Sequence, residues 1–325
     1  MSQKVAVIMG GYSSEIPISL KSGSVVMEVL KSTEYTPFAI HILKDRWVHV
    51  DDYGRETSIN KNDFSVTIDN SKITFDCVFN IIHGNPGENG YMQAYFELLG
   101  IPHTSCGMYQ AALTFNKRDC ISTLKPYGIL TAESFFLNKG DITDEQAIID
   151  KVGLPCFVKA NKAGSSFGVT KVYKKSDLKS AIDVALKEDD EILIESFLDG
   201  IEVTVGVLTY KGKIKVLPIT ELVSERDFFD YEAKYLGKSQ EITPARISEE
   251  MATKVCAIAK KIYTILKMKG VSRSEFIFHN NEPHFLEMNT VPGLTNESIL
   301  PQQAAADGIS MEALIVNAIE EALNK

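Results

Sequence analysis

The stretch Arg273–Gly293 reads RSEFIFHNNEPHFLEMNTVPG and is the most informative part of the chain. It contains two apolar, strand-like runs, 275–279 and 283–287, each with a glutamate at one end. Two neighbouring strands would direct Glu275, Glu287 and Asn289 towards one position. Three oxygen ligands beside an arginine suit Mg²⁺ together with nucleotide phosphates. The stretch therefore favours an enzyme that uses ATP.

Length and composition are those of an ordinary globular protein. The 325 residues are 44% hydrophobic and 24% charged, which is enough for two or three domains with their own cores. The net charge of −9 gives no basis for binding nucleic acid or an anionic membrane. The sequence contains no signal-peptide core and no apolar span of about 18 residues, so a cytoplasmic location is expected. Five dispersed cysteines fit a reducing compartment.

The order of the predicted elements indicates an α/β protein of three units. Strands are predicted at 4–9, 36–43, 75–82, 134–137, 156–159, 169–173, 191–195, 202–210, 213–218, 275–279 and 283–287. Helices are predicted at 18–30, 91–99, 117–125, 177–187, 255–266, 298–307 and 310–323. The predicted units are 1–106, 107–195 and 196–325.

Two of these units carry loops that are suited to ligands. In the first unit, a parallel, Rossmann-like sheet is expected, and the Gly-rich loops 10–15 and 83–90 follow strand ends, where such sheets bind ligands. In the third unit, the polar, aromatic stretch 224–240 is either a lid that excludes water or a surface excursion with local packing.

Phosphate-binding candidates lie in the second unit. The Gly164–Gly168 loop joins two strands, and its backbone N–H groups and the Ser165 and Ser166 hydroxyls can cover phosphates, although an ordinary Gly/Ser turn has the same composition. Lys117 and Lys159 can neutralise phosphate charge, although a single lysine is more commonly a solvated surface charge.

The segment after Glu195 has the pattern of an adenosine slot. The Glu195 carboxylate can receive the adenine amino group, the backbone of 196–198 can contact the ring edge, and Glu202 can hold the ribose hydroxyls. The alternative is a strand that ends in solvated acids.

Taken in order, these residues resemble the ATP-grasp family. The set that carries the resemblance is Lys117, Lys159, Gly164–Gly168, Glu195, Glu202, Arg273, Glu275, Glu287 and Asn289. Further segments, Gly10–Glu15, His83-Gly84, Tyr231–Tyr235 and Asn289–Ser298, narrow the resemblance to D-alanine–D-alanine ligases over essentially the whole chain. The resemblance implies a three-domain ATP-grasp fold.

The resemblance also implies the reaction. Such an enzyme joins two D-alanines to D-alanyl-D-alanine for peptidoglycan precursors, at the expense of ATP and through a D-alanyl phosphate. Two Mg²⁺ ions, for which Mn²⁺ can substitute, would be held by Glu275, Glu287 and Asn289. A homodimer is implied, with no nucleic-acid or membrane partner.

Roles for individual residues follow from the same resemblance. Glu15 would pair with the ammonium of the first D-alanine, and Ser165 and Tyr235 would pin the lid near it. Arg273 and the Gly293 N–H would stabilise the oxyanion, and Ser298 with Ile299 would hold the second carboxylate. His83 would lie near the first substrate, or would be a structural loop residue. The implied ATP-binding residues are Lys117, Lys159, Ser165, Ser166, Glu195, Ser196, Phe197, Leu198, Glu202, Phe228, Lys234 and Leu286.

The sequence departs from the family pattern at three positions. Glu275 stands where aspartate is usual, Ala163 where glutamate is common, and Ser196 where lysine is common. Each departure leaves the groups that the chemistry requires. Two alternatives remain: a ligase that uses D-lactate or another acid and amine, and a non-catalytic nucleotide-binding protein. Glu15, Tyr235 and Ser298 disfavour the first, and Arg273 disfavours the second because a binding module does not need it.

Overall fold

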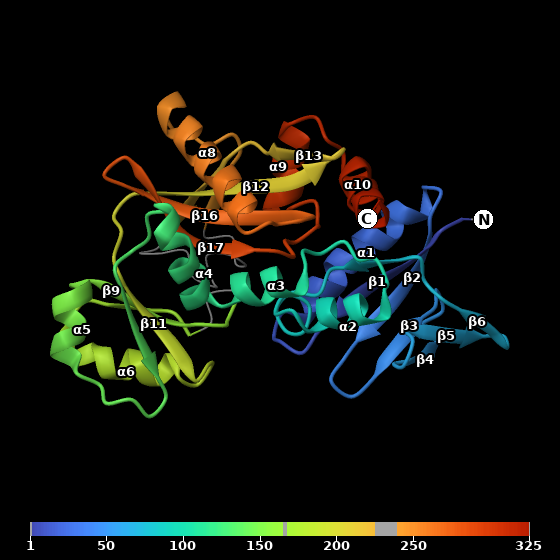
Figure 1. Ribbon diagram of the computed structural model, residues 1–325, viewed down its shortest axis with the longest axis horizontal. Coiled ribbons are helices and arrows are strands. Elements are labelled where there is room, and N and C mark those ends of the chain that lie inside the picture. Colours follow the sequence, from blue (N-terminus) through green and yellow to red (C-terminus); the bar gives the residue numbers. More distant parts are fainter. Residues whose placement is uncertain (1, 165–167, 225–238, 325) are drawn as a thin grey trace.

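The computed structural model describes residues 2–164, 168–224 and 239–324, and arranges them as three β-sheets with covering helices (Figure 1). Five residues of the predicted site, Ser165, Ser166, Phe228, Lys234 and Tyr235, lie outside these described residues, as does most of the predicted lid. The described ends of that lid, Ser224 and Ser239-Gln240, belong to strands.

The first sheet has seven strands. They are β1 (Lys4–Gly10), β2 (Thr36–Ile42), β3 (Trp47–Val50), β4 (Glu56–Asn60), β5 (Ser65–Ile68), β6 (Ser71–Ile73) and β7 (Cys77–Asn80). Their order is β6-β5-β4-β3-β2-β1-β7, and β1 pairs in parallel with both β2 and β7. The expected parallel sheet is therefore confirmed for three strands, whereas the antiparallel extension β3–β6 was not predicted. Its strands have at most five residues, too few to show a clear period.

Helices cover both faces of this sheet. Helix α1 (Ile16–Lys31) and the C-terminal helix α10 (Met311–Leu323) share one core with β1 and β7, and α2 (Tyr91–Leu99) packs on the other face. Strand β1 is buried on both sides, which explains its continuous apolar sequence. The end of the chain thus returns to its beginning, as Figure 1 shows for α10 beside α1.

The second sheet is antiparallel and has four strands. They are β8 (Ser134–Asn138), β9 (Cys156–Ala160), β10 (Thr170–Val172) and β11 (Glu191–Ser196), in the order β10-β9-β11-β8. Helices α5 (Glu145–Val152) and α6 (Lys175–Ala185) cover one face. Alternation along β9 buries Cys156 and Val158 under these helices and directs Phe157 and Lys159 to the opposite face.

The third sheet has six antiparallel strands. They are β12 (Ile201–Tyr210), β13 (Lys213–Val216), β14 (Thr220–Ser224), β15 (Ser239–Ile242), β16 (Val271–His279) and β17 (Glu282–Asn289). The order is β15-β14-β12-β16-β17, with β13 also paired to β12. One face packs on α8 (Glu249–Ile265), α3 (Met108–Phe115) and α4 (Lys117–Leu124), which is followed by a 3-10 turn, Lys125–Tyr127. Helix α9 (Ile299–Ala306) joins the core that α10 shares with the first sheet.

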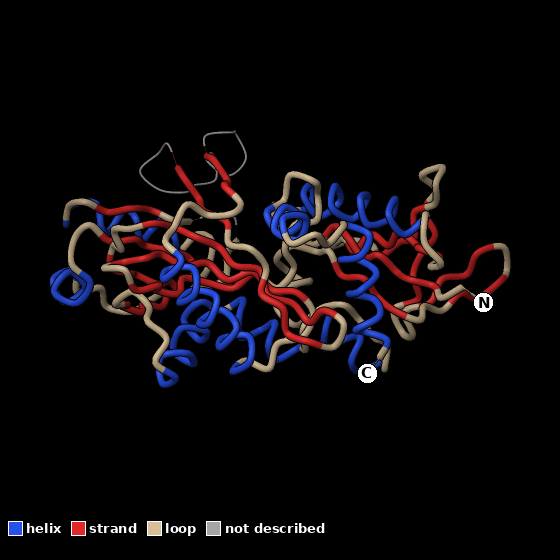
Figure 2. Tube along the Cα trace, turned by 90° about the horizontal axis from the view of Figure 1, so that it is seen from above, coloured by secondary structure: helices blue, strands red, loops and turns tan. Residues whose placement is uncertain are grey.

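The three sheets bring loops from distant parts of the sequence together. Figure 2, a view at 90° to the first, shows the strands running through the length of the molecule with helices outside them.

Helix α3, helix α5 and strands β14 and β15 were not predicted. The division at residues 106 and 195 stays a prediction. Among the described residues, no helix is both long and apolar enough to cross a membrane.

Candidate active site

Strands β16 and β17 gather the residues that the sequence predicts to lie together. Glu275 is the cross-strand partner of Glu287, and Arg273 is the partner of Asn289. Arg273 Nη1 donates hydrogen bonds to Glu275 Oε1 at 2.8 Å and to Thr204 Oγ1 at 3.0 Å. Asn289 Nδ2 donates to the same Glu275 oxygen at 3.2 Å. The Arg273 guanidinium is therefore held on the face that carries the acids.

The oxygen donors at this position fit a hard divalent cation. Glu275 and Glu287 supply carboxylates and Asn289 supplies an amide oxygen, all on one face of two adjacent strands. Within the described part of the chain, no group of three His, Cys, Asp or Glu side chains could form a metal cage. Mg²⁺ commonly takes one or two carboxylates and completes its shell with phosphate and water. The donor set matches that pattern, with Glu275 in place of aspartate.

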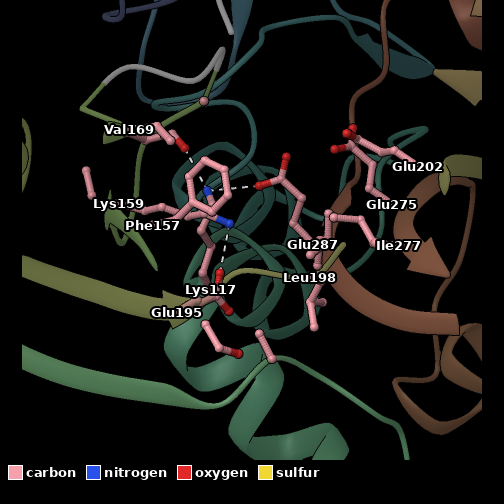
Figure 3. A pocket seen from close by; sticks show the side chains of 16 residues that line it. Lys117, Phe157, Lys159, Val169, Glu195, Leu198, Glu202, Glu275, Ile277 and Glu287 are labelled. Carbon is pink, nitrogen blue, oxygen red and sulfur yellow. Dashed lines mark hydrogen bonds and ion pairs between the residues drawn. The ribbon is translucent and has the colours of Figure 1, made fainter. Parts of the chain in front are cut away.

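A cavity of about 120 Å³ lies between the second and third sheets (Figure 3). Its walls contain seven of the predicted ATP-binding residues: Lys117, Lys159, Glu195, Ser196, Leu198, Glu202 and Leu286. The metal candidates Glu275 and Glu287 also line it. Phe157 and Ile277 add apolar surface from the two sheets. We call this space the nucleotide cavity.

Lys159 and Glu195 form a buried ion pair in the nucleotide cavity. Their Nζ–Oε2 distance is 2.8 Å, and the side chains are 19% and 4% exposed. Burial alone would lower the pKa of Lys159, but the Glu195, Glu287 and Glu202 carboxylates together outweigh burial and hold the pKa above the ordinary value. The other Glu195 oxygen, Oε1, is buried and has no hydrogen-bond partner among the described residues. Glu195 Oε1 can accept a hydrogen bond from a donor such as an adenine amino group.

Lys117 stands at the beginning of α4, which Asn116 caps by accepting from Asp119 N–H. Its Nζ lies 3.0 Å from Glu287 Oε2 and donates to the Ala163 carbonyl at 2.7 Å. Figure 3 draws these interactions as dashed lines. Because the contact to residue 163 is made by its backbone carbonyl, it does not depend on the Ala163 side chain.

Two predicted linker residues have other contacts. The Phe197 side chain does not line the nucleotide cavity; its ring lies 6.2 Å from that of Phe157 and 4.0 Å from Lys171 Nζ. Its N–H donates to the Pro155 carbonyl. Ser196 Oγ accepts a hydrogen bond from Glu133 N–H at 3.1 Å, so this hydroxyl ties the end of β11 to the residue before β8.

A second cavity, of about 560 Å³, adjoins the first, and we call it the substrate cavity. All six predicted substrate residues line it: Glu15, His83, Arg273, Gly293, Ser298 and Ile299. Five residues line both cavities: Lys117, Ala163, Gly164, Glu275 and Glu287. The lysine and the two metal candidates thus stand where the two spaces meet.

Glu15 reaches the substrate cavity between two glycines. A Cβ on Gly164 would lie 3.0 Å from Glu15 Oε2, and a Cβ on Gly84 would lie 3.1 Å from it. Gly84 also has a φ of +68°, which other residues rarely adopt. The two glycines therefore allow loops of the first and second sheets to approach the carboxylate. Ser165, the predicted neighbour of Glu15, lies outside the described residues.

His83 joins the loop after β7 to the loop after β17. Its Nδ1 lies 2.7 Å from the Val291 carbonyl, so Nδ1 carries the proton. Burial lowers the pKa of His83, which favours the neutral ring. Its Nε2 is buried and has no partner among the described residues. Both interpretations of His83, as a structural residue and as a substrate neighbour, agree with this placement.

Glu88 is a residue of this site that the sequence interpretation missed. Its two oxygens accept from the N–H groups of Gly84 at 2.8 Å, Thr290 at 3.2 Å and Val291 at 3.0 Å. Burial, with a smaller contribution from the Glu15 charge, raises the pKa of Glu88 to about 7. Glu88 therefore fixes the loop before Gly293 against the first sheet. Its position in a Gly-rich loop after a buried strand was the available signal.

Gly293 and Ser298 are packed against each other. A Cβ on Gly293 would lie 2.7 Å from Ser298 Oγ, so no larger residue fits there without a shift. Ser298 Oγ lies 3.1 Å from Thr295 N and 2.9 Å from Thr295 Oγ1. These bonds order the turn into α9, whose first residues line the substrate cavity. Helix N-termini favour bound anions such as a carboxylate.

Family models match both halves of the chain. The model described as "D-ala D-ala ligase N-terminus" matches residues 4–106, and "D-ala D-ala ligase C-terminus" matches residues 122–320. A D-alanine–D-alanine ligase of Flavobacterium johnsoniae is 65% identical over 321 residues, covering 99% of each chain.

Solved structures resemble the fold over its full length. The VanG D-Ala:D-Ser ligase of Enterococcus faecalis matches with a TM-score of 0.87 at 30% identity, covering 99% of this chain and 100% of that one. The D-alanine–D-alanine ligase of Bacillus anthracis, solved in complex with ATP, matches with a TM-score of 0.80 at 29% identity, covering 100% of this chain and 98% of that one. The chain belongs to the D-alanine–D-alanine ligase family.

Proposed function

We propose that this enzyme binds ATP in the nucleotide cavity and two D-alanines in the substrate cavity, and joins them through a D-alanyl phosphate. The observation that carries the proposal is the shared wall of the two cavities, formed by Lys117, Glu275 and Glu287. A γ-phosphate at that wall would face the carboxylate of a D-alanine bound in the substrate cavity. Phosphoryl transfer depends mainly on such positioning and on charge neutralisation.

ATP binding would use groups that already face the nucleotide cavity. Glu195 Oε1 would accept the adenine amino group, Glu202 would hold the ribose, and Lys117 and Lys159 would meet the phosphates. The Bacillus anthracis relative, whose structure contains ATP, supports this use of the fold. Roles for Ser165, Ser166, Phe228, Lys234 and Tyr235 belong to the same proposal and rest on the family resemblance.

Glu275, Glu287 and Asn289 would hold Mg²⁺, which in this position neutralises phosphate charge when it is bound. Mn²⁺ accepts the same oxygen donors. Because Lys117 and Arg273 contact these carboxylates, the acids are already compensated by positive charge. This arrangement avoids two uncompensated carboxylates in a partly buried space.

In the substrate cavity, Glu15 would bind the ammonium of the first D-alanine and leave its carboxylate facing the phosphate. Attack of that carboxylate on the γ-phosphate gives D-alanyl phosphate and ADP. The ammonium of the second D-alanine then gives up a proton to solvent, the free amine attacks the carbonyl carbon, and the C–O bond to phosphate breaks so that inorganic phosphate leaves. Arg273 and the Gly293 N–H would stabilise the oxyanion, and the first turn of α9 would hold the second carboxylate.

The acceptor is the part of the proposal with a specific alternative. The name of the VanG relative indicates D-serine as its acceptor, and D-lactate is the other candidate considered above. The test measures phosphate release from ATP and Mg²⁺ with D-alanine alone and with D-serine or D-lactate added, and identifies each product by mass. D-alanyl-D-alanine as the main product supports the proposal. ATP turnover without dependence on D-alanine would contradict it.

The three-domain division at residues 106 and 195 and a homodimer are also proposed, both from the family resemblance. Light scattering of the purified enzyme tests the dimer, and limited proteolysis tests the division, because domain boundaries in exposed linkers are cleaved first.

A further inference from the structure

One carboxylate of the substrate cavity has no role in the chemistry described so far. Glu241 lies on β15 and lines this cavity with Arg273, Ser298 and Ile299. Glu241 is the cross-strand partner of Leu222, which in turn is the partner of Glu202 on β12. Side chains in such a row share a face of the sheet, so Glu241 lies on the face that carries Glu202 and the nucleotide cavity.

The contacts of Glu241 place it at the acceptor end of the cavity. Gln302 Nε2 lies 3.4 Å from Glu241 Oε2, and Gln302 is on α9, one turn after Ser298. The first residues of α9 are those proposed to hold the carboxylate of the second D-alanine. The next residue along, Gln303, donates to Thr204 O and Thr220 Oγ1, which fixes α9 over this part of the sheet.

Other charged groups of the cavity lie at different positions. Glu15 adjoins Gly84 and Gly164, Glu88 is bonded to the loop at 290–291, and Glu297 pairs with Lys21 at 3.6 Å. Glu275 and Glu287 are in contact with Arg273 and Lys117. Burial raises the pKa of Glu241, although the Arg273 charge and the Gln302 hydrogen bond act in the opposite direction.

We infer that Glu241 determines acceptor specificity by binding the ammonium of the second amino acid, in preference to the hydroxyl of a 2-hydroxy acid. This inference rests on the proposed function. A partly buried carboxylate attracts an ammonium at contact distance more strongly than an exposed one does, because less water screens the two charges. A hydroxy acid offers one neutral hydrogen bond instead. Glu241 therefore favours amide over ester formation.

A purely structural role makes a different prediction. If Glu241 only anchors Gln302 or balances the Arg273 charge, its loss disturbs the subsite for every acceptor equally. The two roles are separated by the ratio of products from competing acceptors, because that ratio cancels general loss of activity.

The experiment compares wild type, Glu241→Gln and Glu241→Asp with D-alanine and D-lactate offered together in a fixed mixture with ATP and Mg²⁺. Mass spectrometry gives the ratio of D-alanyl-D-alanine to D-alanyl-D-lactate. We expect Glu241→Gln to lower this ratio at least about tenfold. Glu241→Asp keeps the charge and should give an intermediate ratio. The KM for the second D-alanine should rise while that for the first is retained.

Glu221→Gln is the matched control. Glu221 is on the adjacent strand β14, its partner is Ile242, and it pairs with Arg246 at 2.9 Å on the opposite face of the sheet. The control removes the same charge away from the cavity and should leave the product ratio unchanged. A ratio that stays constant in both Glu241 variants overturns the inference alone. If the wild type forms no D-alanyl-D-alanine, the proposed function fails as well, so the two failures are distinguishable.

Discussion

The nucleotide cavity and the substrate cavity are built in different ways. The first is formed mainly by side chains on strands of two sheets, and both of its lysines are paired with strand carboxylates. The second is formed mainly by loops and a helix start from all three sheets, held by hydrogen bonds between residues as much as 208 positions apart. Strands fix the ATP side, and long-range loop contacts fix the amino-acid side.

This difference separates two ways of damaging the enzyme. A change on the strand side should act locally, through one lost charge. A change on the loop side should act through displacement of several groups that depend on the same contacts. Arg273 belongs to a strand but lines only the substrate cavity, where it contacts Glu275, a residue of both cavities.

The largest effect is expected for Arg273→Ala. Loss of one oxyanion donor commonly lowers kcat by about 10²–10³-fold, and Arg273 also holds Glu275. The variant should show this loss in kcat with a much smaller change in ATP affinity, measured by steady-state kinetics and nucleotide titration.

Arg246→Ala serves as its control, because Arg246 is 61% exposed and pairs with Glu221 away from the cavity. Equal losses in kcat and ATP affinity in Arg273→Ala would contradict the assignment of Arg273 to the transition state. They would indicate that Arg273 acts in ATP binding instead.

Lys159→Met tests the strand side. It leaves the 4% exposed Glu195 carboxylate without its partner, and breaking a buried pair in this way typically costs about 3–5 kcal/mol. The double variant Lys159→Met/Glu195→Gln should recover most of that loss in urea unfolding, because no charge is left buried alone. Both variants should bind ATP weakly. A double variant as unstable as the single one would show that packing, not charge, dominates there.

The comparison also explains what the sequence could predict. Glu275, Glu287 and Asn289 were identifiable because their two strands are long, apolar and adjacent in sequence, so a period of two places them on one face. Lys159 and Glu195 were identifiable because each stands at the end of a predicted strand, and both line the nucleotide cavity.

Glu88 could not be placed in this way. Its role depends on backbone N–H groups 202 and 203 residues away, and no local pattern encodes such contacts. The short strands β3–β6 and the helix α3 were missed for a related reason: their length is too small for a period, and packing against distant elements decides their structure. Glu241 belongs to β15, a strand of four residues, and was missed with it.

Glu88→Gln tests the loop side through pH. The folded pKa of Glu88, about 7, is above its ordinary value of 4.5. A raised carboxyl pKa contributes stability below pH 4.5, and this contribution is lost as the pH rises to about 7. Wild type should therefore lose more stability than Glu88→Gln over this range, by on the order of 2 kcal/mol in urea unfolding. The difference between the two proteins cancels the titration of His83. If the curves of unfolding free energy against pH run parallel for the two proteins, folding does not raise the pKa of Glu88.

The smallest effect is expected for the pair Lys21–Glu297, at the edge of the substrate cavity. Its atoms are 3.6 Å apart, and the two side chains are 68% and 76% exposed. Water and salt weaken the attraction between exposed charges, and holding two long side chains in one geometry costs conformational entropy. Lys21→Ala, Glu297→Ala and the double variant should each shift the thermal unfolding midpoint by less than about 1 °C. A larger, non-additive shift would show that this pair ties α1 to the turn before α9, and the substrate cavity would then be held at its rim as well as by His83 and Glu88.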